Sequence, residues 1–222
     1  MIVAKPKPIE EVIDSVKPYD RILLVGCNEC VTVCEAGGRK EVGVLASALR
    51  MFFMNQGRTV RIDERTIERQ CDREYLEELR GDMDGADAVL SLACGVGVQF
   101  MAETYFQKPV LPGVDTCFMG GSLERGVWTE RCQGCGQCVL AVTGGICPVS
   151  RCAKRLFNGP CGGSTKGKCE ISKDLDCAWQ LIVDRLKELG RLDDYEKLAP
   201  IKDWSTERAG GPRTVTREDV RQ

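Results

Sequence analysis

Short apolar runs recur along the first half of the chain and predict a set of buried strands. Residues 21–25 (RILLV) form a continuous apolar segment between Asp20 and Gly26, which is typical of a strand buried on both faces. Similar runs predict three further strands, at residues 59–63, 86–93 and 108–112.

Amphipathic segments separate these strands. In residues 40–56, Val42, Ala46 and Leu49 recur at intervals of three and four before Gly57, which predicts a helix with one face on a sheet. Two more helices are expected at residues 74–83 and 98–106. Alternating strands and helices favour a parallel sheet, so the predicted fold class is α/β: a small parallel-sheet domain like half of a Rossmann-like fold.

From residue 128 the periodicity weakens, and glycine, proline and cysteine dominate. We expect an irregular cysteine-rich metal-binding module there, with short helices at residues 152–157 and 177–189, which metal must stabilise because apolar residues are few. The predicted organisation is an N-terminal extension (1–20), an α/β domain with a metal site at its strand ends (21–127), the metal-cluster module (128–190) and a C-terminal arm (191–222).

The C-terminal arm has one small amphipathic stretch, residues 193–198, and no core of its own. Two interpretations stay open for the segment with Leu198, Pro200 and Trp204. It drapes over its own domain, or it grasps a partner subunit. The last dozen residues are expected to be disordered.

Composition narrows the metal sites and the enzyme classes that are possible, because the chain contains no histidine. Mixed cysteine and histidine zinc sites, Rieske-type clusters and His-dependent hydrolases are therefore excluded. All-thiolate zinc or iron–sulfur sites remain. No nucleophile with a base is evident, so we expect a non-catalytic subunit.

Charge and targeting signals indicate a cytoplasmic protein. The net charge of −2 gives no reason to expect nucleic acid as a partner. The N-terminus lacks the apolar core of a signal peptide, and no stretch approaches the ~18 apolar residues of a spanning helix, so we expect no membrane insertion. In a reducing cytosol, clustered cysteines point to metal rather than to disulfides.

Eight of the fourteen cysteines lie between Cys132 and Cys177. The first three, Cys132, Cys135 and Cys138, repeat the C-x2-C-x2-C spacing of bacterial ferredoxins, which favours a [4Fe–4S] cluster over zinc. Cys147 precedes a proline, as does the ferredoxin cysteine that ligates the other cluster, so the pairing of ligands stays open. The wider spacing of the other four fits a structural zinc site equally well: Cys152, Cys161, Cys169 and Cys177.

Five further cysteines follow the predicted strands, whose carboxyl ends bind ligands in doubly wound sheets. They are Cys27, Cys30, Cys34, Cys71 and Cys94. We expect four of the five to hold metal, with Cys71 or Cys27 as the spare, although any single one could be a buried apolar side chain. Cys117 stands apart. Gly37-Gly38 and Gly95-Val-Gly97 complete no dinucleotide motif.

Several longer strings carry a family resemblance. They are GCNECVTVC (26–34), ERQC (68–71), LACGVGVQ (92–99), RCQGCGQC (131–138), GICP (145–148), RCAK (151–154), NGPCGG (158–163) and CAW (177–179). Over roughly residues 20–204 the chain resembles the methylenetetrahydrofolate reductase C-terminal family, the MetV-type subunit that accompanies a MetF-type flavoprotein in acetogens and related anaerobes.

The resemblance implies an electron-transfer subunit with two or three [4Fe–4S] clusters, with zinc as the alternative occupant of one site. Its partner would be the MetF-type flavoprotein, which carries the flavin and makes methyltetrahydrofolate, together with a further electron-donor subunit. Two alternatives come from other classes. One is a zinc-stabilised scaffold subunit of the same flavoprotein, and the other is an independent enzyme that uses a site-differentiated cluster.

Overall fold

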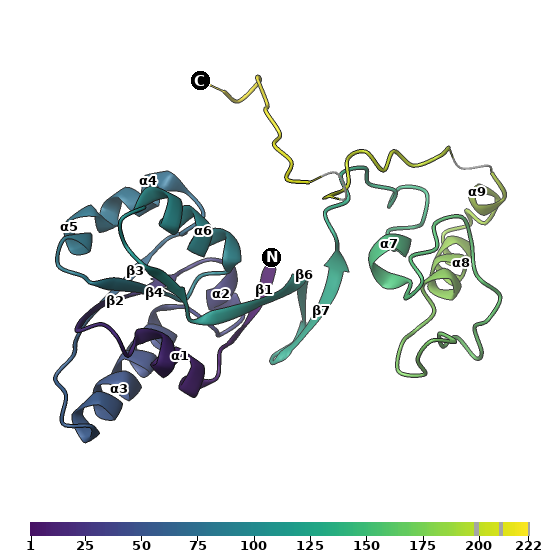
Figure 1. The fold of residues 1–222 in the computed structure, drawn as a ribbon. Helices are drawn as coiled ribbons and strands as arrows, with labels where there is room; N and C mark the ends of the chain where they lie inside the picture. Colours follow the sequence, from purple (N-terminus) through teal and green to yellow (C-terminus); the bar gives the residue numbers. More distant parts are fainter. Residues whose placement is uncertain (198–199, 209–210, 222) are drawn as a thin grey trace. The chain divides into compact units, whose positions relative to one another are not determined.

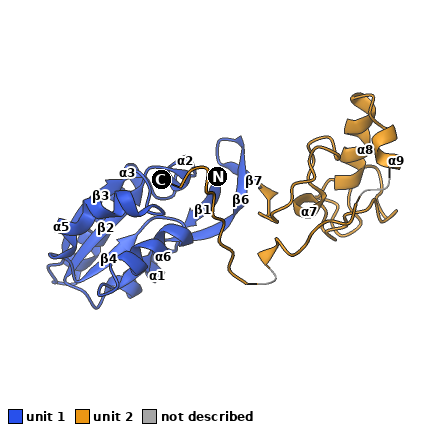
Figure 2. Ribbon diagram, turned by 90° about the horizontal axis from the view of Figure 1, so that it is seen from above, with its two compact units in different colours: residues 1–129 blue, residues 130–222 orange. Residues whose placement is uncertain are grey.

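The computed structural model describes residues 1–197, 200–208 and 211–221. The chain forms two compact units, residues 1–129 and residues 130–222 (Figure 2). Sequence placed the division between residues 127 and 128. The helices of the described part are all too short or too polar to cross a lipid bilayer.

Unit 1 contains the predicted parallel sheet. Its strands are β2 (Arg21–Cys27), β3 (Arg61–Ile67), β4 (Ala88–Ser91) and β5 (Val110–Pro112), in the order β3-β2-β4-β5. All three neighbouring pairs are parallel. The α/β prediction is therefore confirmed, although β3 begins and ends later than the predicted strand. The strand order changes direction between β2 and β4.

Helices cover both faces of this sheet (Figure 1). Because alternate side chains of a strand point to opposite faces, Ile22 and Leu24 of β2 join one core, and Leu23 and Val25 join the other. On the first face lie α1 (Ile9–Val16) and α3 (Arg39–Asn55); on the second lie α4 (Arg73–Leu76), α5 (Arg80–Met83) and α6 (Gly95–Thr104). The layers confirm the predicted half of a doubly wound sheet.

One predicted helix differs in detail. Residues 74–83 were expected as a single helix, but the structure has α4 and α5 joined by the 3₁₀ turn η1 (Glu77–Leu79). Leu76 and Leu79 are both fully buried at a spacing of three residues, which a tighter turn brings onto one face. Gly81 further weakens a regular α-helix there.

The N-terminal 20 residues, expected as an extension, form β1 (Ile2–Pro6) and α1. Strand β1 pairs antiparallel with β6 (Val114–Glu124), and β7 (Val127–Cys132) completes a second sheet in the order β1-β6-β7. Sequence missed this sheet because β1 pairs with a strand more than a hundred residues away in the middle of the chain, and because Pro6 and Pro8 obscure the strand pattern of β1.

Unit 2 is largely irregular, as predicted. Its helices are α7 (Pro148–Arg151), α8 (Ala178–Glu188) and α9 (Asp193–Glu196). Helix α8 confirms the prediction for residues 177–189. The predicted helix at residues 152–157 is wrong, because Cys152 is extended (φ −87°, ψ 122°) and Arg155 has φ 54°. Of the amphipathic stretch 193–198, Leu198 lies outside the described residues.

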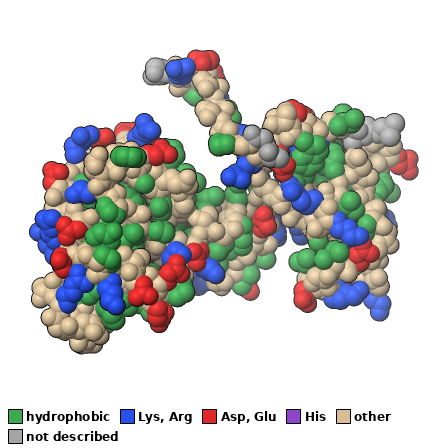
Figure 3. Space-filling view, viewed as in Figure 1, with side chains coloured by type: hydrophobic (Ala, Val, Ile, Leu, Met, Phe, Trp, Pro, Cys, Tyr) green, Lys and Arg blue, Asp and Glu red, His purple; other side chains and the backbone are tan. Residues whose placement is uncertain are grey.

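The core of unit 2 is small. It consists of Trp179, Ile182 and Leu186 on α8, with Ile146, Cys152 and Cys177 packed against them. Other apolar side chains lie at the surface among charged ones, as one face shows in Figure 3, and Leu140, Val142, Ile171 and Leu175 are exposed.

A buried amide joins the strand ends of unit 1. Gln70 is fully buried, and its Nε2 donates to the carbonyl oxygens of Val25 (2.9 Å) and Gly26 (3.0 Å) at the end of β2. The Oε1 atom of Gln70 accepts from Ser91 Oγ (2.6 Å) at the end of β4. Ser91 Oγ in turn accepts from Ala93 N (3.2 Å). One side chain thus links β2, β4 and the segment that leads to Cys71.

We predict that Gln70→Leu destabilises unit 1 by about 2–4 kcal/mol, because a side chain of similar size removes the amide's hydrogen bonds to the carbonyl oxygens of Val25 and Gly26 and the buried acceptor of the Ser91 hydroxyl. Urea unfolding followed by circular dichroism measures the change. The matched control is Gln107→Leu in an exposed turn, where a change below about 0.5 kcal/mol is expected. Equal effects of the two substitutions would show that the hydrogen bonds of Gln70 do not stabilise unit 1.

Candidate metal centres

Four cysteines of unit 1 lie where its parallel strands end. Cys27 is the last residue of β2, and Cys30 is the first of the short helix α2 (Cys30–Val33). Cys94 is the N-cap of α6, just after β4, and Cys71 follows Gln70 in the turn before α4. Since the strand order reverses between β2 and β4, these thiols surround the position where doubly wound sheets bind their ligands.

These thiols lie close enough to one another to shift each other's pKa values. Burial raises the pKa of the Cys27 thiol, and the thiols of Cys71 and Cys94 add to the shift against opposing backbone hydrogen bonds. Burial also raises the pKa of Cys71, with Cys94 and Cys30 as its neighbouring thiols. We call Cys27, Cys30, Cys71 and Cys94 the edge thiols.

Cys34 faces away from most of this group. Its Sγ donates to the carbonyl oxygen of Ile2 in β1 (3.5 Å). Its pKa is raised first by burial, and its thiol neighbours are Cys30 and Cys117. Cys117 is exposed on β6 and donates to Asp115 O (3.7 Å). Cys34 thus lies beside β1, and which four of the five cysteines would hold metal stays a prediction.

Two glycines allow the segments that carry the edge thiols to approach closely. A Cβ on Gly37 would lie 1.9 Å from the carbonyl oxygen of Leu92, just before Cys94. A Cβ on Gly97 would lie 2.9 Å from Cβ of Gln70 and 2.7 Å from that of Ala93. Glycine is needed here because no side chain fits between the packed backbones.

The C-x2-C-x2-C segment of unit 2 forms a loop that begins at the end of β7. Gly134 and Gly136 adopt positive φ angles (60° and 86°), which let the chain turn between successive cysteines. The amide of Gly134 donates to Cys132 Sγ (3.3 Å). Such N–H···S bonds stabilise the thiolate form that binds metal.

Cys147 is the N-cap of α7. The hydroxyl of Ser150, within that helix, donates to the carbonyl oxygen of Arg131 (2.9 Å), which ties α7 to the start of the loop. We call Cys132, Cys135, Cys138 and Cys147 the loop thiols.

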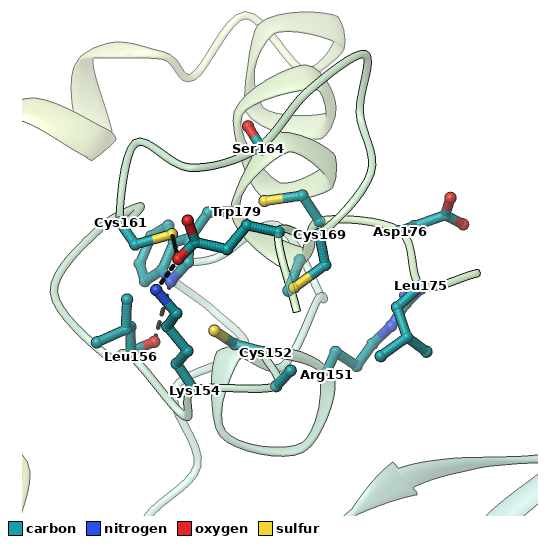
Figure 4. Close-up of a pocket in the computed structure, with 14 residues that line it drawn as sticks. Arg151, Cys152, Lys154, Leu156, Cys161, Ser164, Cys169, Leu175, Asp176 and Trp179 are labelled. Carbon is teal, nitrogen blue, oxygen red and sulfur yellow. Dashed lines mark hydrogen bonds and ion pairs between the residues drawn. The ribbon is translucent and has the colours of Figure 1, made fainter. Parts of the chain in front are cut away.

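The four widely spaced cysteines of unit 2 line a single cavity of about 20 Å³ (Figure 4). Cys152 follows α7 and Cys177 precedes α8, so both ends of the segment between them are anchored on helices. Two backbone hydrogen bonds fold this segment: Cys177 N donates to Gly167 O (2.8 Å), and Cys169 N donates to Leu175 O (2.9 Å). These bonds fold the chain back on itself and bring Cys152, Cys161, Cys169 and Cys177, the pocket thiols, to one place.

Cationic side chains accompany the pocket thiols. Lys154 forms an ion pair with Glu170, whose Oε1 also accepts from Cys161 Sγ (3.5 Å). The guanidinium of Arg151 lines the same cavity, and burial, with Arg131 nearby, lowers its pKa. Four thiolates around a divalent ion carry excess negative charge, which such cations offset.

Across residues 1–197, 200–208 and 211–221, no three Cys, Asp or Glu side chains are arranged closely enough to hold a metal ion together. The thiols gather without closing on a common centre. Their donor sets, four sulfur atoms each, nevertheless suit all-thiolate zinc or iron–sulfur sites.

Comparison with known families gives a match in the second part of the chain. Residues 111–205 match the family model described as methylene-tetrahydrofolate reductase C terminal. This segment is similar to the C-terminal part of methylene-tetrahydrofolate reductases. No curated protein and no solved structure matches the chain.

The segment of the methylene-tetrahydrofolate reductase C-terminal family includes all the loop thiols and pocket thiols. The edge thiols lie before it, in the part of unit 1 for which the resemblance over residues 20–204 remains an expectation. The family match therefore supports the cysteine-rich unit most directly.

Several residues of these centres were not predicted from sequence. Gln70 and Ser91 order the strand ends near the edge thiols, and Lys154 and Glu170 lie among the pocket thiols. Gln70 and Lys154 lie within the strings ERQC and RCAK that carry the resemblance, but no role was predicted for either. Ser91 and Glu170 lie outside the quoted strings.

We predict that Cys94→Ser lowers the metal content of the protein by the occupant of the edge thiols, whereas Cys34→Ser leaves it unchanged. The physical reason is that Cys94 neighbours Cys27 and Cys71, while Cys34 donates to a backbone carbonyl. Iron and zinc analysis of the two variants, purified without oxygen, makes the measurement. Equal loss in both variants would show that Cys34 is a ligand.

Proposed function

We propose that this protein is the electron-transfer subunit of a methylenetetrahydrofolate reductase complex, and that it passes electrons through iron–sulfur clusters to a flavin-containing MetF-type partner. One observation carries the proposal: eight of the fourteen cysteines lie between Cys132 and Cys177, within the segment that matches the methylene-tetrahydrofolate reductase C-terminal model. When bound, iron–sulfur clusters exchange single electrons at potentials that their surroundings set.

The three groups suit different metals. The loop thiols have ferredoxin spacing, and the edge thiols lie at the ligand position of an open α/β sheet, so both are assigned [4Fe–4S] clusters. The pocket thiols line one cavity, and their wide spacing suits a structural four-thiolate zinc site. We therefore assign zinc to the pocket thiols, where it would stabilise the fold without redox chemistry.

The chain's own residues determine what it can contribute to the reaction. With no histidine, it offers no imidazole as a proton carrier. The family resemblance, rather than this composition, assigns folate and flavin to the MetF-type partner and the supply of electrons to a further subunit. An independent enzyme would need a cluster with an open coordination position. Groups of four thiols give no reason to expect one.

A zinc-stabilised scaffold is the second candidate, and the small cavity of the pocket thiols favours it. If zinc occupied all three groups, the subunit would hold its flavoprotein without carrying electrons. Metal identity at the loop and edge thiols thus decides between the two functions.

Purification without oxygen should give a brown protein with about eight iron atoms, about eight sulfides and one zinc per chain. We expect a broad visible absorption that dithionite bleaches. Co-expression with a MetF-type flavoprotein should give a complex in which reduced clusters reduce the flavin. A colourless protein that contains only zinc would contradict electron transfer and support the scaffold.

We predict that Cys135→Ala and Cys169→Ser separate the two metals of unit 2. Cys135→Ala should remove about four iron atoms and keep the zinc, whereas Cys169→Ser should remove the zinc. Both should lower the thermal stability of unit 2, because metal binding and folding are coupled there. Cys117→Ser, at an exposed thiol outside the three groups, is the matched control. Unchanged melting in both metal-site variants would show that unit 2 folds without metal.

A further inference from the structure

The C-terminal segment lies on the loop that carries Cys132, Cys135 and Cys138. After α9 the chain, yellow in Figure 1, returns to the teal loop that follows β7. The amide of Asp203 donates to Gln137 Oε1 (2.7 Å), and Thr206 Oγ1 donates to Cys135 O (2.9 Å). We call residues 202–207 the strap.

The approach of the strap is close. A Cβ on Gly136 would lie 2.5 Å from Thr206, so the loop has room for the strap only because position 136 is glycine. Farther along, Arg213 donates to Gly134 O (2.7 Å). Carbonyl groups of the loop, at residues 134, 135 and 137, thus receive donors from one C-terminal segment.

Lys202 is the unusual member of the strap, because it is only 4% exposed. Its Nζ donates to Gln137 O (2.8 Å) and lies 5.0 Å from the centre of the Trp204 ring, and both partners are uncharged. The nearby carboxylate of Asp203 is engaged by Ser205, through its amide (2.9 Å) and its hydroxyl. Burying an ammonium group is costly unless a negative charge compensates it.

The Asp203 carboxylate, which interacts electrostatically with Lys202, supplies part of that charge, and the loop thiols would add to it. A [4Fe–4S] cluster with four thiolate ligands is a net anion, and it becomes more negative on reduction. A fixed cation beside the loop favours the reduced state, because the potential of a cluster depends on local charge, hydrogen bonds and solvent exposure. Trp204 holds this arrangement by packing edge-on against Phe157 at 6.2 Å between ring centres.

We propose that the strap locks the cluster loop and that Lys202 is a positioning residue whose ammonium raises the reduction potential of the cluster there. The proposal rests on the proposed function for its electrostatic part. It also favours the interpretation in which the C-terminal arm drapes over its own domain, because Trp204 packs against Phe157 within its own unit.

The test compares Lys202→Met and Thr206→Val with Lys173→Met and Thr214→Val, which make the same changes at exposed positions. Three quantities are measured on the full chain: the midpoint potential by redox titration with electron paramagnetic resonance, iron release to a chelator, and deuterium exchange of amides 132–138. We expect a more negative potential only for Lys202→Met. Both strap variants should release iron about tenfold faster, the equivalent of one lost hydrogen bond.

The outcomes are distinguishable. If the wild-type loop holds no iron, the proposed function fails there, and the strap is judged by deuterium exchange alone, which both variants should accelerate. If iron is present and Lys202→Met leaves the potential unchanged, the electrostatic part is overturned. If deuterium exchange and iron release in the strap variants equal those of the controls, the proposal that the strap locks the cluster loop is overturned.

Discussion

Unit 2 buries too little apolar surface to be held together by the hydrophobic effect alone, and the arrangement of its cysteines follows from this constraint. Its buried apolar side chains, among the described residues, are Val149, Ala178, Trp179, Ile182 and Leu186. Such a core cannot offset the conformational entropy of ordering long irregular segments. Cross-links are needed, and under the proposed function thiolate–metal bonds would provide them.

Unit 1 is built on the opposite principle. Its sheet is covered on both faces, so buried apolar side chains stabilise its fold. Its cysteines lie at the edge where the parallel strands end. Gln70 keeps that edge together by satisfying carbonyl groups of β2 and the hydroxyl of Ser91 with one buried amide. A centre on such a scaffold is preorganised, whereas a centre in unit 2 forms together with its surroundings.

This difference suits an electron carrier with two kinds of metal. A structural ion at the pocket thiols would be enclosed and surrounded by charges that Lys154 and Glu170 balance. The loop thiols are more exposed, with Cys132 and Cys138 at the surface, which suits a centre that exchanges electrons with another protein. The strap then shields the backbone of the loop without covering those two thiols.

Much of this could be read from residues alone. Apolar runs and helical spacing determined the parallel sheet, α3 and α8, because local pattern and burial coincide there. Cysteine spacing and the absence of histidine limit any metal site of this chain to all-thiolate ligands, and that such sites are occupied stays a prediction. The family resemblance placed the cysteine-rich segment correctly.

Only the tertiary structure decided which thiols are neighbours. In the structure Cys34 contacts β1, and the pocket thiols line one cavity although they lie on loops with no regular pattern. Lys202 and Thr206 bind a loop about seventy residues earlier in the chain. The tertiary structure also paired β1 with β6. These contacts join residues far apart in the chain through backbone carbonyls and single polar side chains, and such contacts leave no periodic trace in a sequence.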